Sequence, residues 1–391
     1  MIKKLVDDFK KTFNDDGKVD VFFSPGRVNL IGEHTDYNGG FVFPCALDFG
    51  TYGVAKKRSD NKFIVYSQNF EKLGIIEFTL DDLKYEKKDN WANYVKGVIK
   101  AFIDAGYEIK TGFDLLILGT IPNGAGLSSS ASLELLISVI LKDFSNLSID
   151  MIDMVKLSQK AENQFIGVNC GIMDQFAIGM GKENNAILLD CNTLKYEYAP
   201  ISLNGASVVI ANTNKKRGLA DSKYNERRAS CEAAVKELNK HGINIKYLGE
   251  LAVKEFEKVK HFIQDKEQLK RATHAVTENE RTKEAVEKLN AGDIKGFGEL
   301  MNKSHISLRD DYEVTGKELD SLVEAAWNAP GVIGSRMTGA GFGGCTVSIV
   351  KDEDIDKFIE VVGKEYFDKT GLKADFYVAK IGDGSRKLGE F

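Results

Sequence analysis

Apolar and polar residues follow two different periodicities in the first half of the chain. Short β-branched and aromatic runs bounded by turn residues are typical of strands. Four such runs predict strands at 19–23, 41–47, 63–67 and 113–120. Between and after them, apolar residues recur at helical spacing. This second pattern predicts helices at 91–105, 128–144 and 151–165. We expect the strands to form a mixed or antiparallel sheet.

The pattern changes near residue 200, which indicates a domain boundary. Pro200 and the Asn204–Gly205 step precede the strand-like run ASVVIANT, after which charged helix-like segments dominate to about residue 328. Strand patterns and one helix follow, with the strands at 332–337, 345–350 and near 375–381. We therefore predict an α+β fold of two domains, 1–205 and 206–391.

Length and composition agree with a globular protein of two lobes. A chain of 391 residues is too long for one ordinary hydrophobic core, so a cleft between lobes is available. Hydrophobic residues make up 43% and charged residues 28%, the balance of a soluble globular protein. The formal net charge of -5 gives no global positive field for nucleic acid or anionic membranes. Any bound anion must therefore be held locally.

The cysteines predict neither a disulfide framework nor a zinc site. There are 5, scattered along the chain, and none forms a CxxC pair. The N-terminal segment is charged throughout, unlike a signal peptide, and no uncharged run approaches the length of a membrane span. We expect reduced thiols in a cytoplasmic monomer that has no nucleic-acid, membrane or protein partner.

The first candidate site is SPGRVNLIGEHTDYNGG, residues 24–40. It places Arg27, Glu33, His34 and Asp36 among glycines, which permit unusual backbone angles. Two carboxylates three residues apart in such a loop can accept hydrogen bonds from neighbouring hydroxyls of one polyol. A charged surface turn is the alternative, but the glycine content and the density of ionisable groups favour a binding site.

The second candidate, IPNGAGLSSSASLELL at residues 121–136, is a Pro/Gly loop that leads into serines and an amphipathic helix. Glycines let backbone N–H groups approach a ligand, serine hydroxyls add donors or a metal ligand, and a helix N-terminus favours negative charge. These features predict a phosphate-binding loop. No GxxxxGK[ST] occurs in the chain, so the P-loop NTPase interpretation loses its main support. An ordinary serine-capped helix start is the alternative.

The third candidate, MTGAGFGGCTVSIV at residues 337–350, satisfies GxGxxG through Gly339, Gly341 and Gly344. In a Rossmann fold such glycines open a helix, whereas here they lead into a β-branched run. A glycine-rich hairpin is the plain alternative. A loop that closes over the second motif explains the pattern better.

In this order and at these separations, the three motifs resemble the signatures of the GHMP small-molecule kinases. GRVNLIGEHTDY resembles the signature of the galactokinase branch, and the resemblance continues through CGIMDQF (170–176) and NTNKKRGLADSKYNERR (212–228). It spans nearly the whole chain, although the tail KIGDGSRKLGEF matches less clearly. The resemblance implies a two-domain GHMP kinase fold. The N-terminal domain would be similar to the second domain of ribosomal protein S5, with the active site in the cleft between the domains.

The resemblance also implies roles for individual residues. Asp174 would be the acidic group beside the reacting hydroxyl, and Arg27 would act with it. The sugar would contact Glu33, His34, Asp36, Gly171, Asp174 and Tyr224. ATP would contact Trp91, Gly124, Ala125, Gly126, Leu127, Ser128, Ser129 and Ser130. Ser130 and Glu162 would lie beside the magnesium ion.

Each role has a plain alternative when the resemblance is set aside. Glu162 could be a solvated charge on an amphipathic helix, and Asp174 could cap the short helix that follows it. Tyr224 could be a packing residue on a charged helix. Trp91 and Tyr94, which would line the adenine pocket, could equally be core residues.

The implied reaction transfers the γ-phosphoryl group of ATP to the anomeric hydroxyl of galactose. Its products are galactose 1-phosphate and ADP, as in galactose catabolism by the Leloir pathway. Phosphoryl transfer depends mainly on positioning and charge stabilisation. Asp174 would accept the hydroxyl proton, Arg27 would offset charge on the moving group, and Mg²⁺ would bridge phosphate oxygens.

Three alternatives to this function differ in what supports them. N-acetylgalactosamine or another GHMP substrate could replace galactose, because the motifs do not show the shape of the pocket. A non-catalytic sensor of ATP and galactose is disfavoured by the complete SSSAS segment and by Asp174. A nicotinamide oxidoreductase depends only on GAGFGG, which no helical pattern follows.

Overall fold

The largest sheet of the protein has six strands, in the spatial order β13-β1-β3-β6-β4-β5. The computed structural model describes residues 1–122, 126–215 and 220–391. β4 runs parallel to β6 and the other neighbouring strands are antiparallel, so the sheet is mixed, one of the two predicted forms. The strands are β1 (Asp20–Asn29), β3 (Pro44–Lys57), β4 (Lys62–Ser67), β5 (Ile76–Thr79), β6 (Phe113–Gly119) and β13 (Arg386–Glu390).

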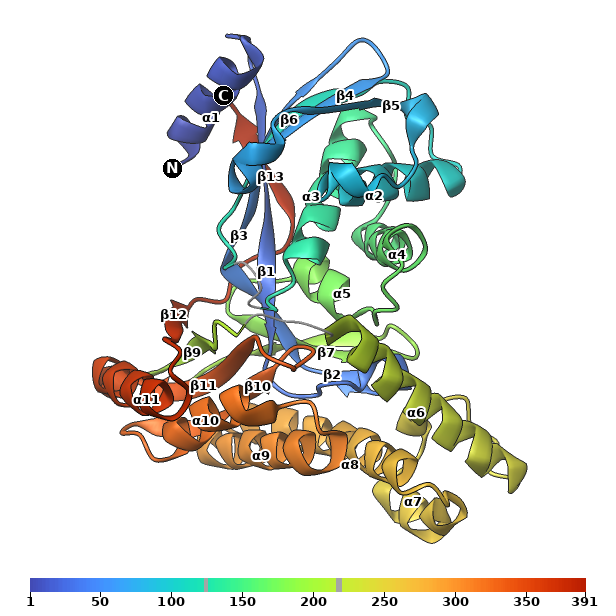
Figure 1. Ribbon diagram of the computed structural model, residues 1–391, viewed down its shortest axis with the longest axis vertical. Helices are drawn as coiled ribbons and strands as arrows, with labels where there is room; N and C mark the ends of the chain where they lie inside the picture. The colour runs from blue at the N-terminus through green and yellow to red at the C-terminus, as the bar shows by residue number, and fades with distance from the viewer. Residues whose placement is uncertain (123–125, 216–219) are drawn as a thin grey trace.

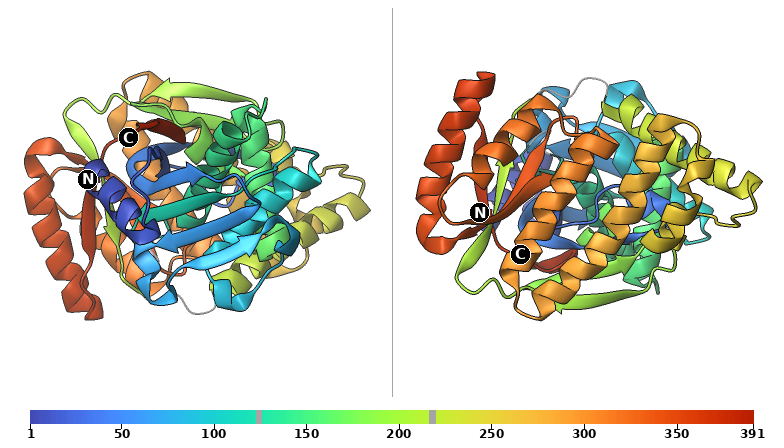
Figure 2. Two further views of the ribbon diagram at one scale, coloured as in Figure 1. Left: turned by 90° about the horizontal axis from the view of Figure 1, so that it is seen from above. Right: turned by 90° about the horizontal axis from the view of Figure 1, so that it is seen from below.

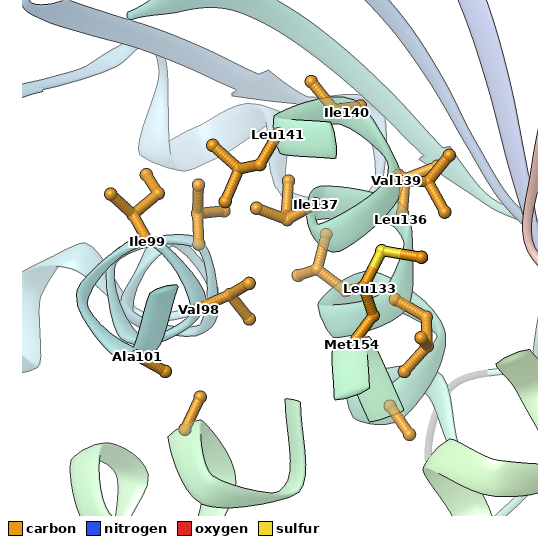
Figure 3. Packing of buried hydrophobic residues seen from close by; sticks show 14 of the residues in the cluster. Val98, Ile99, Ala101, Leu133, Leu136, Ile137, Val139, Ile140, Leu141 and Met154 are labelled. Carbon is orange, nitrogen blue, oxygen red and sulfur yellow. The ribbon is translucent and has the colours of Figure 1, made fainter. Parts of the chain in front are cut away.

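Successive residues of the central strands pack on opposite faces of this sheet. Val21 and Leu116 pack against α1 (Ile2–Phe13), whereas their neighbours Phe22 and Leu115 belong to a larger core. Four helices cover that second face (Figure 1), namely α2 (Ala92–Asp104), α3 (Ser129–Phe144), α4 (Met151–Ala161) and α5 (Met173–Met180). Side chains of α2, α3 and α4 converge there (Figure 3). Burial of each aliphatic side chain stabilises the folded state by about 1.5–3 kcal/mol. This core therefore holds the ends of α3 and α5 in place.

A four-stranded sheet, in the order β10-β11-β9-β12, lies at the centre of the C-terminal half. Its strands are β9 (Ala206–Asn212), β10 (Val332–Thr338), β11 (Cys345–Lys351) and β12 (Asp375–Ala379). One face packs against α10 (Gly316–Trp327) and α11 (Ile355–Thr370), and the other face packs against α8 (Lys266–Asn290) and α9 (Ile294–Ser307) (Figures 1 and 2). α6 (Ala220–Lys240) and α7 (Val253–Val259) contact α8. Among the helices that the structure describes, none is both long and apolar enough to cross a bilayer.

The predicted strand at 41–47 is divided between two sheets. β2 (Phe41–Val42) joins β7 (Asn185–Asp190) and β8 (Tyr196–Pro200) in a three-stranded sheet, whereas β3 begins at Pro44. The backbone N–H of Phe43, between them, donates to Ile31 O at 3.0 Å. This bond turns the chain back onto the first motif and ends the regular pairing.

The last strand, β13, is missing from the predicted elements. It pairs antiparallel with β1, with Glu390 opposite Asp20, and thereby returns the end of the chain to the N-terminal sheet. Lys387 forms ion pairs with Asp20 at 2.9 Å and with Asp143 at 2.8 Å. The strand is mostly polar and lies at a sheet edge, so it carries no apolar alternation for a sequence pattern to detect.

The predicted helix at 151–165 consists of two parts. Its regular part, α4, ends at Ala161 and continues as η5 (Glu162–Ile166), a wider π-type turn. Turns of this type occur frequently at functional sites. Here the turn carries the buried side chain of Glu162.

Candidate active site

Arg27 and Asp174 form a two-pronged ion pair between β1 and α5. Arg27 follows a register shift in β1, and Asp174 lies in the first turn of α5. Arg27 Nε donates to Asp174 Oδ1 at 2.8 Å, and Nη2 donates to Oδ2 at 2.9 Å. Burial opposes the charge of Arg27, but the carboxylates of Asp174 and Glu33 outweigh it and raise the pKa of the guanidinium. The Asp174 side chain is 30% exposed, which leaves it accessible to a ligand.

The loop before α3 is attached to this ion pair. Arg27 Nη1 donates to Gly126 O at 2.8 Å, and the Ser128 hydroxyl donates to Asp174 Oδ2. Ser128 has a φ of 63°, in the left-handed region that non-glycine residues rarely adopt. Asp174 does not cap its own helix, because the N-cap of α5 is Ile172. The structure therefore brings the predicted acid, its arginine and the serine segment together.

Ser129 and Ser130 are the first two residues of α3, at the positive end of the helix dipole. Both line a hollow of about 190 Å³, together with Trp91 and Tyr94. Trp91 Nε1 is buried and has no hydrogen-bond partner among the described residues. Buried donors are nearly always paired in folded proteins, so the indole N–H is a group that a ligand in this hollow could satisfy. Trp91 also packs in the core of helices and sheet, so it is a core residue that lines this hollow, and its contact with adenine stays a prediction.

The remaining residues predicted to contact ATP differ in position. Leu127 is buried among apolar side chains, and its backbone carbonyl accepts a hydrogen bond from the Arg27 N–H at 3.3 Å. Leu127 can thus contact ATP only through its backbone. Gly124 and Ala125 lie outside the described residues.

A cavity of about 480 Å³ opens beside Asp174. This volume is within the range of pockets that bind small molecules. Its lining includes every residue predicted to contact the sugar, together with the arginine, namely Arg27, Glu33, His34, Asp36, Gly171, Asp174 and Tyr224. The N-terminal half of the chain supplies all of these except Tyr224, which α6 contributes.

The Asp36 carboxyl group can lie close to residue 171 because that residue is a glycine and has no side chain. A Cβ on Gly171 would lie 1.8 Å from Asp36 Oδ2, so no other residue fits without displacing the carboxyl group. Burial and the negative charge of Asp174 raise the pKa of Asp36 to about 7. Asp36 is therefore a poorly solvated carboxyl group whose charge a sugar hydroxyl could stabilise by donating to it.

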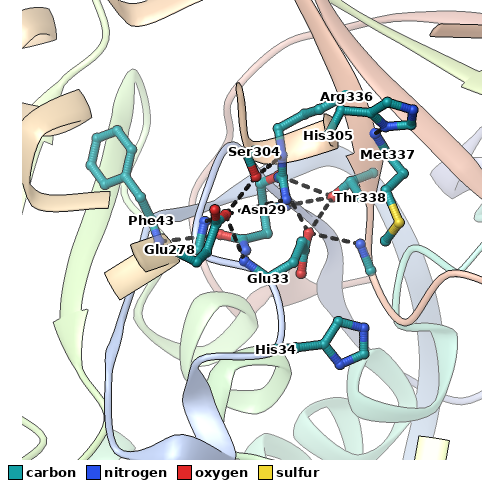
Figure 4. A network of polar contacts seen from close by, with 12 residues as sticks. Asn29, Glu33, His34, Phe43, Glu278, Ser304, His305, Arg336, Met337 and Thr338 are labelled. Atoms are coloured by element: carbon teal, nitrogen blue, oxygen red, sulfur yellow. Dashed lines mark hydrogen bonds and ion pairs between the residues drawn. The ribbon is translucent and has the colours of Figure 1, made fainter. Parts of the chain in front are cut away.

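Glu33 belongs to a buried network that joins the first motif to the C-terminal half (Figure 4). Its Oε1 accepts from the Gly339 N–H at 2.8 Å and lies 3.5 Å from Arg336 Nη1. Arg336 Nη2 lies 3.8 Å from Glu278 Oε1, which accepts from the Gly32 N–H at 3.0 Å. Burial raises the pKa of Glu33 despite the two arginines nearby. Glu33 thus holds the loop in place as well as lining the cavity.

His34 and Tyr224 form an aromatic wall of the cavity. Their ring centroids lie 5.6 Å apart. His34 has a φ of 61° and is buried, and burial lowers its pKa to about 3. The imidazole is therefore neutral at physiological pH and can offer one donor and one acceptor nitrogen.

Ser130 and Glu162 meet where the two hollows adjoin. Ser130 lines the smaller hollow and Glu162 lines the larger one, and the Ser130 hydroxyl is close enough to Glu162 to lower the pKa of that carboxyl group. Burial and the charge of Asp174 raise the pKa of Glu162 to about 7. Mg²⁺ is usually held by one or two carboxylates in addition to substrate phosphates, so a hydroxyl and a carboxylate at this junction fit that ion.

Two further polar residues lie behind Glu162, and sequence reasoning missed both. Gln175 Nε2 donates to Glu162 Oε2 at 2.7 Å and to Glu134 Oε2 at 3.0 Å. Burial and the charge of Glu162 raise the pKa of Glu134 far above its usual range. Glu134 could have been noticed because it lies between Leu133 and Leu135 in an apolar helix. A charged residue is rarely buried there without a partner, so its position indicates a polar contact.

The third motif lines the same cavity as Asp174. Gly339 and Ala340 line it, and a Cβ on Gly339 would come within 3.0 Å of Gly126 O in the second motif. The glycines lead from β10 into β11 and open no helix, as expected from the sequence. The dinucleotide-binding interpretation therefore has no structural support.

The site combines a carboxylate that can accept a proton, a guanidinium, and a helix start rich in hydroxyls. A polyol-sized cavity lies on one side of Asp174, and a hollow with an aromatic wall lies beside the serines. This arrangement suits the transfer of a phosphoryl group to a hydroxyl, because positioning and charge stabilisation account for most of that catalysis.

Comparison with known proteins agrees with this chemistry. The family described as "Galactokinase galactose-binding signature" matches residues 7–57, "GHMP kinases N terminal domain" matches residues 93–182, and "GHMP kinases C terminal" matches residues 285–369. A galactokinase of Fusobacterium nucleatum is 71% identical over 388 residues, which cover 99% of this chain and 100% of the relative. A galactokinase of Bacillus subtilis is 55% identical over 99% of each chain.

Solved structures give the same result. Galactokinase of Lactococcus lactis, complexed with galactose, is 53% identical and has a TM-score of 0.97 over 99% of this chain and 100% of its own. The mevalonate kinase of Methanococcus jannaschii, 20% identical, has a TM-score of 0.67 over 94% of this chain and 100% of its own, and shows the shared fold alone.

Proposed function

This chain belongs to the galactokinase family of the GHMP kinases, and on that premise we propose that Asp174 and Arg27 act directly on the hydroxyl that is phosphorylated. The chain catalyses the ATP-dependent phosphorylation of galactose, which gives galactose 1-phosphate and ADP. The observation that carries the proposed roles is the two-pronged ion pair at the edge of a 480 Å³ cavity.

Asp174 accepts the proton of the anomeric hydroxyl in this proposal. General-base catalysis of this kind contributes about 10²–10⁴-fold to the rate. Arg27 orients the carboxylate through both of its oxygens and offsets negative charge on the phosphoryl group as it moves. The 30% exposure of the Asp174 side chain supports contact with a sugar hydroxyl.

The sugar lies among the other residues of the cavity. Asp36 accepts hydrogen bonds from its hydroxyls, and Gly171 leaves the room that Asp36 requires. His34 and Tyr224 contribute polar groups and ring faces, and Glu33 places the loop. The buried polar groups of this pocket favour galactose over analogues that leave them unpaired.

ATP occupies the adjoining hollow, with its adenine against Trp91 and Tyr94 and its phosphates at the N-terminus of α3. Backbone N–H groups and serine hydroxyls there can hold the phosphates. Ser130 and Glu162 would hold a magnesium ion, which neutralises phosphate charge when bound. Gln175 keeps the Glu162 carboxyl aligned through its amide N–H.

A coupled ADP-release assay tests the choice of acceptor. With ATP and magnesium, the purified chain is given galactose, glucose, talose, glucosamine, N-acetylgalactosamine, mevalonate and homoserine in parallel. We expect the highest kcat/KM with galactose. A higher kcat/KM with N-acetylgalactosamine would assign the chain to another acceptor, and binding of both ATP and galactose without ADP release would indicate a sensor.

A further inference from the structure

A line of hydrogen-bonded side chains leads from the sugar cavity into the protein. It consists of His34, Tyr37, Tyr312 and Cys231, and is called the tyrosine chain below. His34 Nδ1 lies 2.7 Å from the Tyr37 hydroxyl, which lies 2.8 Å from the Tyr312 hydroxyl. The Cys231 thiol lies 3.2 Å from the Tyr312 hydroxyl. Only His34 has a role in the proposed function.

The tyrosine chain joins segments that are distant in sequence. Tyr37 lies in η1 (Asp36–Asn38), Tyr312 ends the π-type turn η8 (Leu308–Tyr312), and Cys231 lies in α6. His34, Tyr312 and Cys231 are buried. Buried polar groups rarely stay unpaired, so the Tyr312 hydroxyl is expected to have its partners within the protein.

Chemistry fixes the direction of these hydrogen bonds. His34 Nε2 lies 3.2 Å from the Ala340 carbonyl oxygen, which can only accept. The ring is neutral, because burial lowers its pKa to about 3, so it has one N–H. That N–H must therefore be on Nε2, and Nδ1 must accept from the Tyr37 hydroxyl.

The same reasoning extends along the tyrosine chain. A phenol has a single O–H, so once Tyr37 donates to His34 its oxygen must accept from Tyr312. The Tyr312 oxygen then accepts from the Cys231 thiol. Every bond runs in one direction, from Cys231 toward the imidazole.

The backbone of His34 is held independently of the tyrosine chain, whereas its ring also packs against one member of that chain, Tyr312. The backbone has a φ of 61°, and the carbonyl accepts from Asn38 Nδ2 at 2.7 Å. The rings of Tyr312 and Tyr224 lie 4.8 Å and 5.6 Å from the imidazole. Figure 4 shows the ring apart from the Glu33–Arg336 network, so that network does not orient it. His34 keeps a left-handed backbone conformation that non-glycine residues rarely adopt, which indicates that the position of its ring is important for function.

We propose that Tyr37 and Tyr312 are positioning residues that hold the His34 imidazole with its Nε2–H at the sugar cavity, so that the site offers galactose a fixed hydrogen-bond donor there. This proposal rests on the proposed function of the cavity. In this structure the donor is bonded to Ala340 O. A sugar hydroxyl can both donate and accept, so with sugar present only the tyrosine chain would specify the tautomer.

Imidazole ¹⁵N NMR of the full-length protein tests the tautomer without any turnover. The chain has 5 histidines, and His34→Gln identifies the signals of His34 by their loss. We expect the Nε2–H tautomer with and without galactose. In Tyr37→Phe the Nδ1 signal should move toward that of an unbonded ring nitrogen. An Nδ1–H tautomer or a charged ring in the wild type overturns the proposal, whether or not galactose is the acceptor.

Steady-state kinetics test what the positioning does. Tyr37→Phe should raise the KM for galactose about tenfold, equivalent to about 1.4 kcal/mol, with kcat within about threefold of wild type. Tyr312→Phe should raise KM by a smaller factor, because Tyr37 still donates to His34. The matched control is Tyr366→Phe, which removes the hydroxyl that donates to Thr213 O at 2.7 Å and should leave KM unchanged. If the tautomer is as expected but the KM for galactose is unchanged in both Tyr37→Phe and Tyr312→Phe, the two tyrosines have only a structural role and the positioning role is wrong.

Discussion

The first motif and the serine segment at residues 126–130 are held in place by different partners. Buried groups of the C-terminal half hold the first motif, where Glu33 is bonded to Gly339 and lies close to Arg336. In the serine segment, Ser128 is bonded to Asp174, and Ser130 lies close to Glu162, whose pKa it lowers. These four residues are themselves proposed to contact the substrates or the metal ion. The proposed sugar side is therefore held by buried contacts within the protein, whereas the proposed phosphate side has polar groups that ATP and its metal could engage.

This difference assigns separate tasks to the two regions. Selecting one sugar requires buried polar groups at fixed positions, since an analogue that leaves such groups unpaired is rejected strongly. Binding phosphates requires accessible donors and a helix N-terminus, which suit any nucleoside triphosphate of the right size. Variants in the first motif and its supports should change stability and galactose KM. Variants in the serine segment should change the response to ATP and magnesium.

The largest effect is expected from Arg336→Leu, which leaves the buried carboxylates of Glu33 and Glu278 without their shared arginine. Removing one partner of a buried ion pair costs about 3–5 kcal/mol of stability. Urea unfolding followed by circular dichroism measures it. The matched control, Arg309→Leu, removes an exposed pair with Asp310 and should change the free energy of unfolding by about 1 kcal/mol or less. Equal losses in the two variants would show that the first motif is not held by buried charge.

Gly171→Ala should act on sugar binding. The new Cβ would lie 1.8 Å from Asp36 Oδ2 and must displace that carboxyl group. A shift of this size at a binding residue lowers kcat/KM for galactose about 10²-fold. Gly363→Ala in α11, where a Cβ comes no closer than 3.3 Å to Phe376, should leave kcat/KM unchanged. Unaltered kinetics in Gly171→Ala would remove Asp36 from the sugar contacts.

Asp36→Asn should change how stability depends on pH. The raised pKa of Asp36, about 7, means that the folded chain keeps a proton that the unfolded chain releases near its ordinary value of 3.8. The wild type therefore loses stability progressively as pH rises from about 4 to about 7, and asparagine avoids this loss. The variant should gain about 1–2 kcal/mol relative to wild type between pH 5 and pH 8 in urea unfolding without ligands. A difference that stays constant with pH would contradict the cause given for the raised pKa.

Ser130→Ala should have the smallest effect of the four. It removes a hydroxyl that lowers the pKa of Glu162 and is proposed to lie beside magnesium. Because phosphates supply most of the ligands of such an ion, the concentration of magnesium giving half-maximal activity should rise only about threefold to tenfold. The KM for galactose in the same variant is the internal control and should stay the same. A change in galactose KM alone would move Ser130 to the sugar side.

The residues of the site differ in how far the sequence alone predicts them. The first motif could be predicted because dense charge among glycines is unusual in any core, whereas Asp174 is indicated only by the resemblance to the GHMP kinases. The structure brings both to one cavity. The roles of those residues, and the domain division at 205/206, stay proposals. Arg336 and Glu278 carry no local signal, because their importance depends on burial between segments 58 residues or more apart. The same holds for Gln175, whose amide is shared by two glutamates on different helices.

The most direct test of the account compares galactose binding with phosphoryl transfer in Asp174→Asn. Asparagine keeps the size of the side chain but cannot take the proton. Calorimetry should give a Kd for galactose within about threefold of wild type. Rapid-quench measurement of a single turnover should show transfer slowed by about 10²–10⁴-fold. A single-turnover rate near that of the wild type would contradict the role of Asp174 as the base.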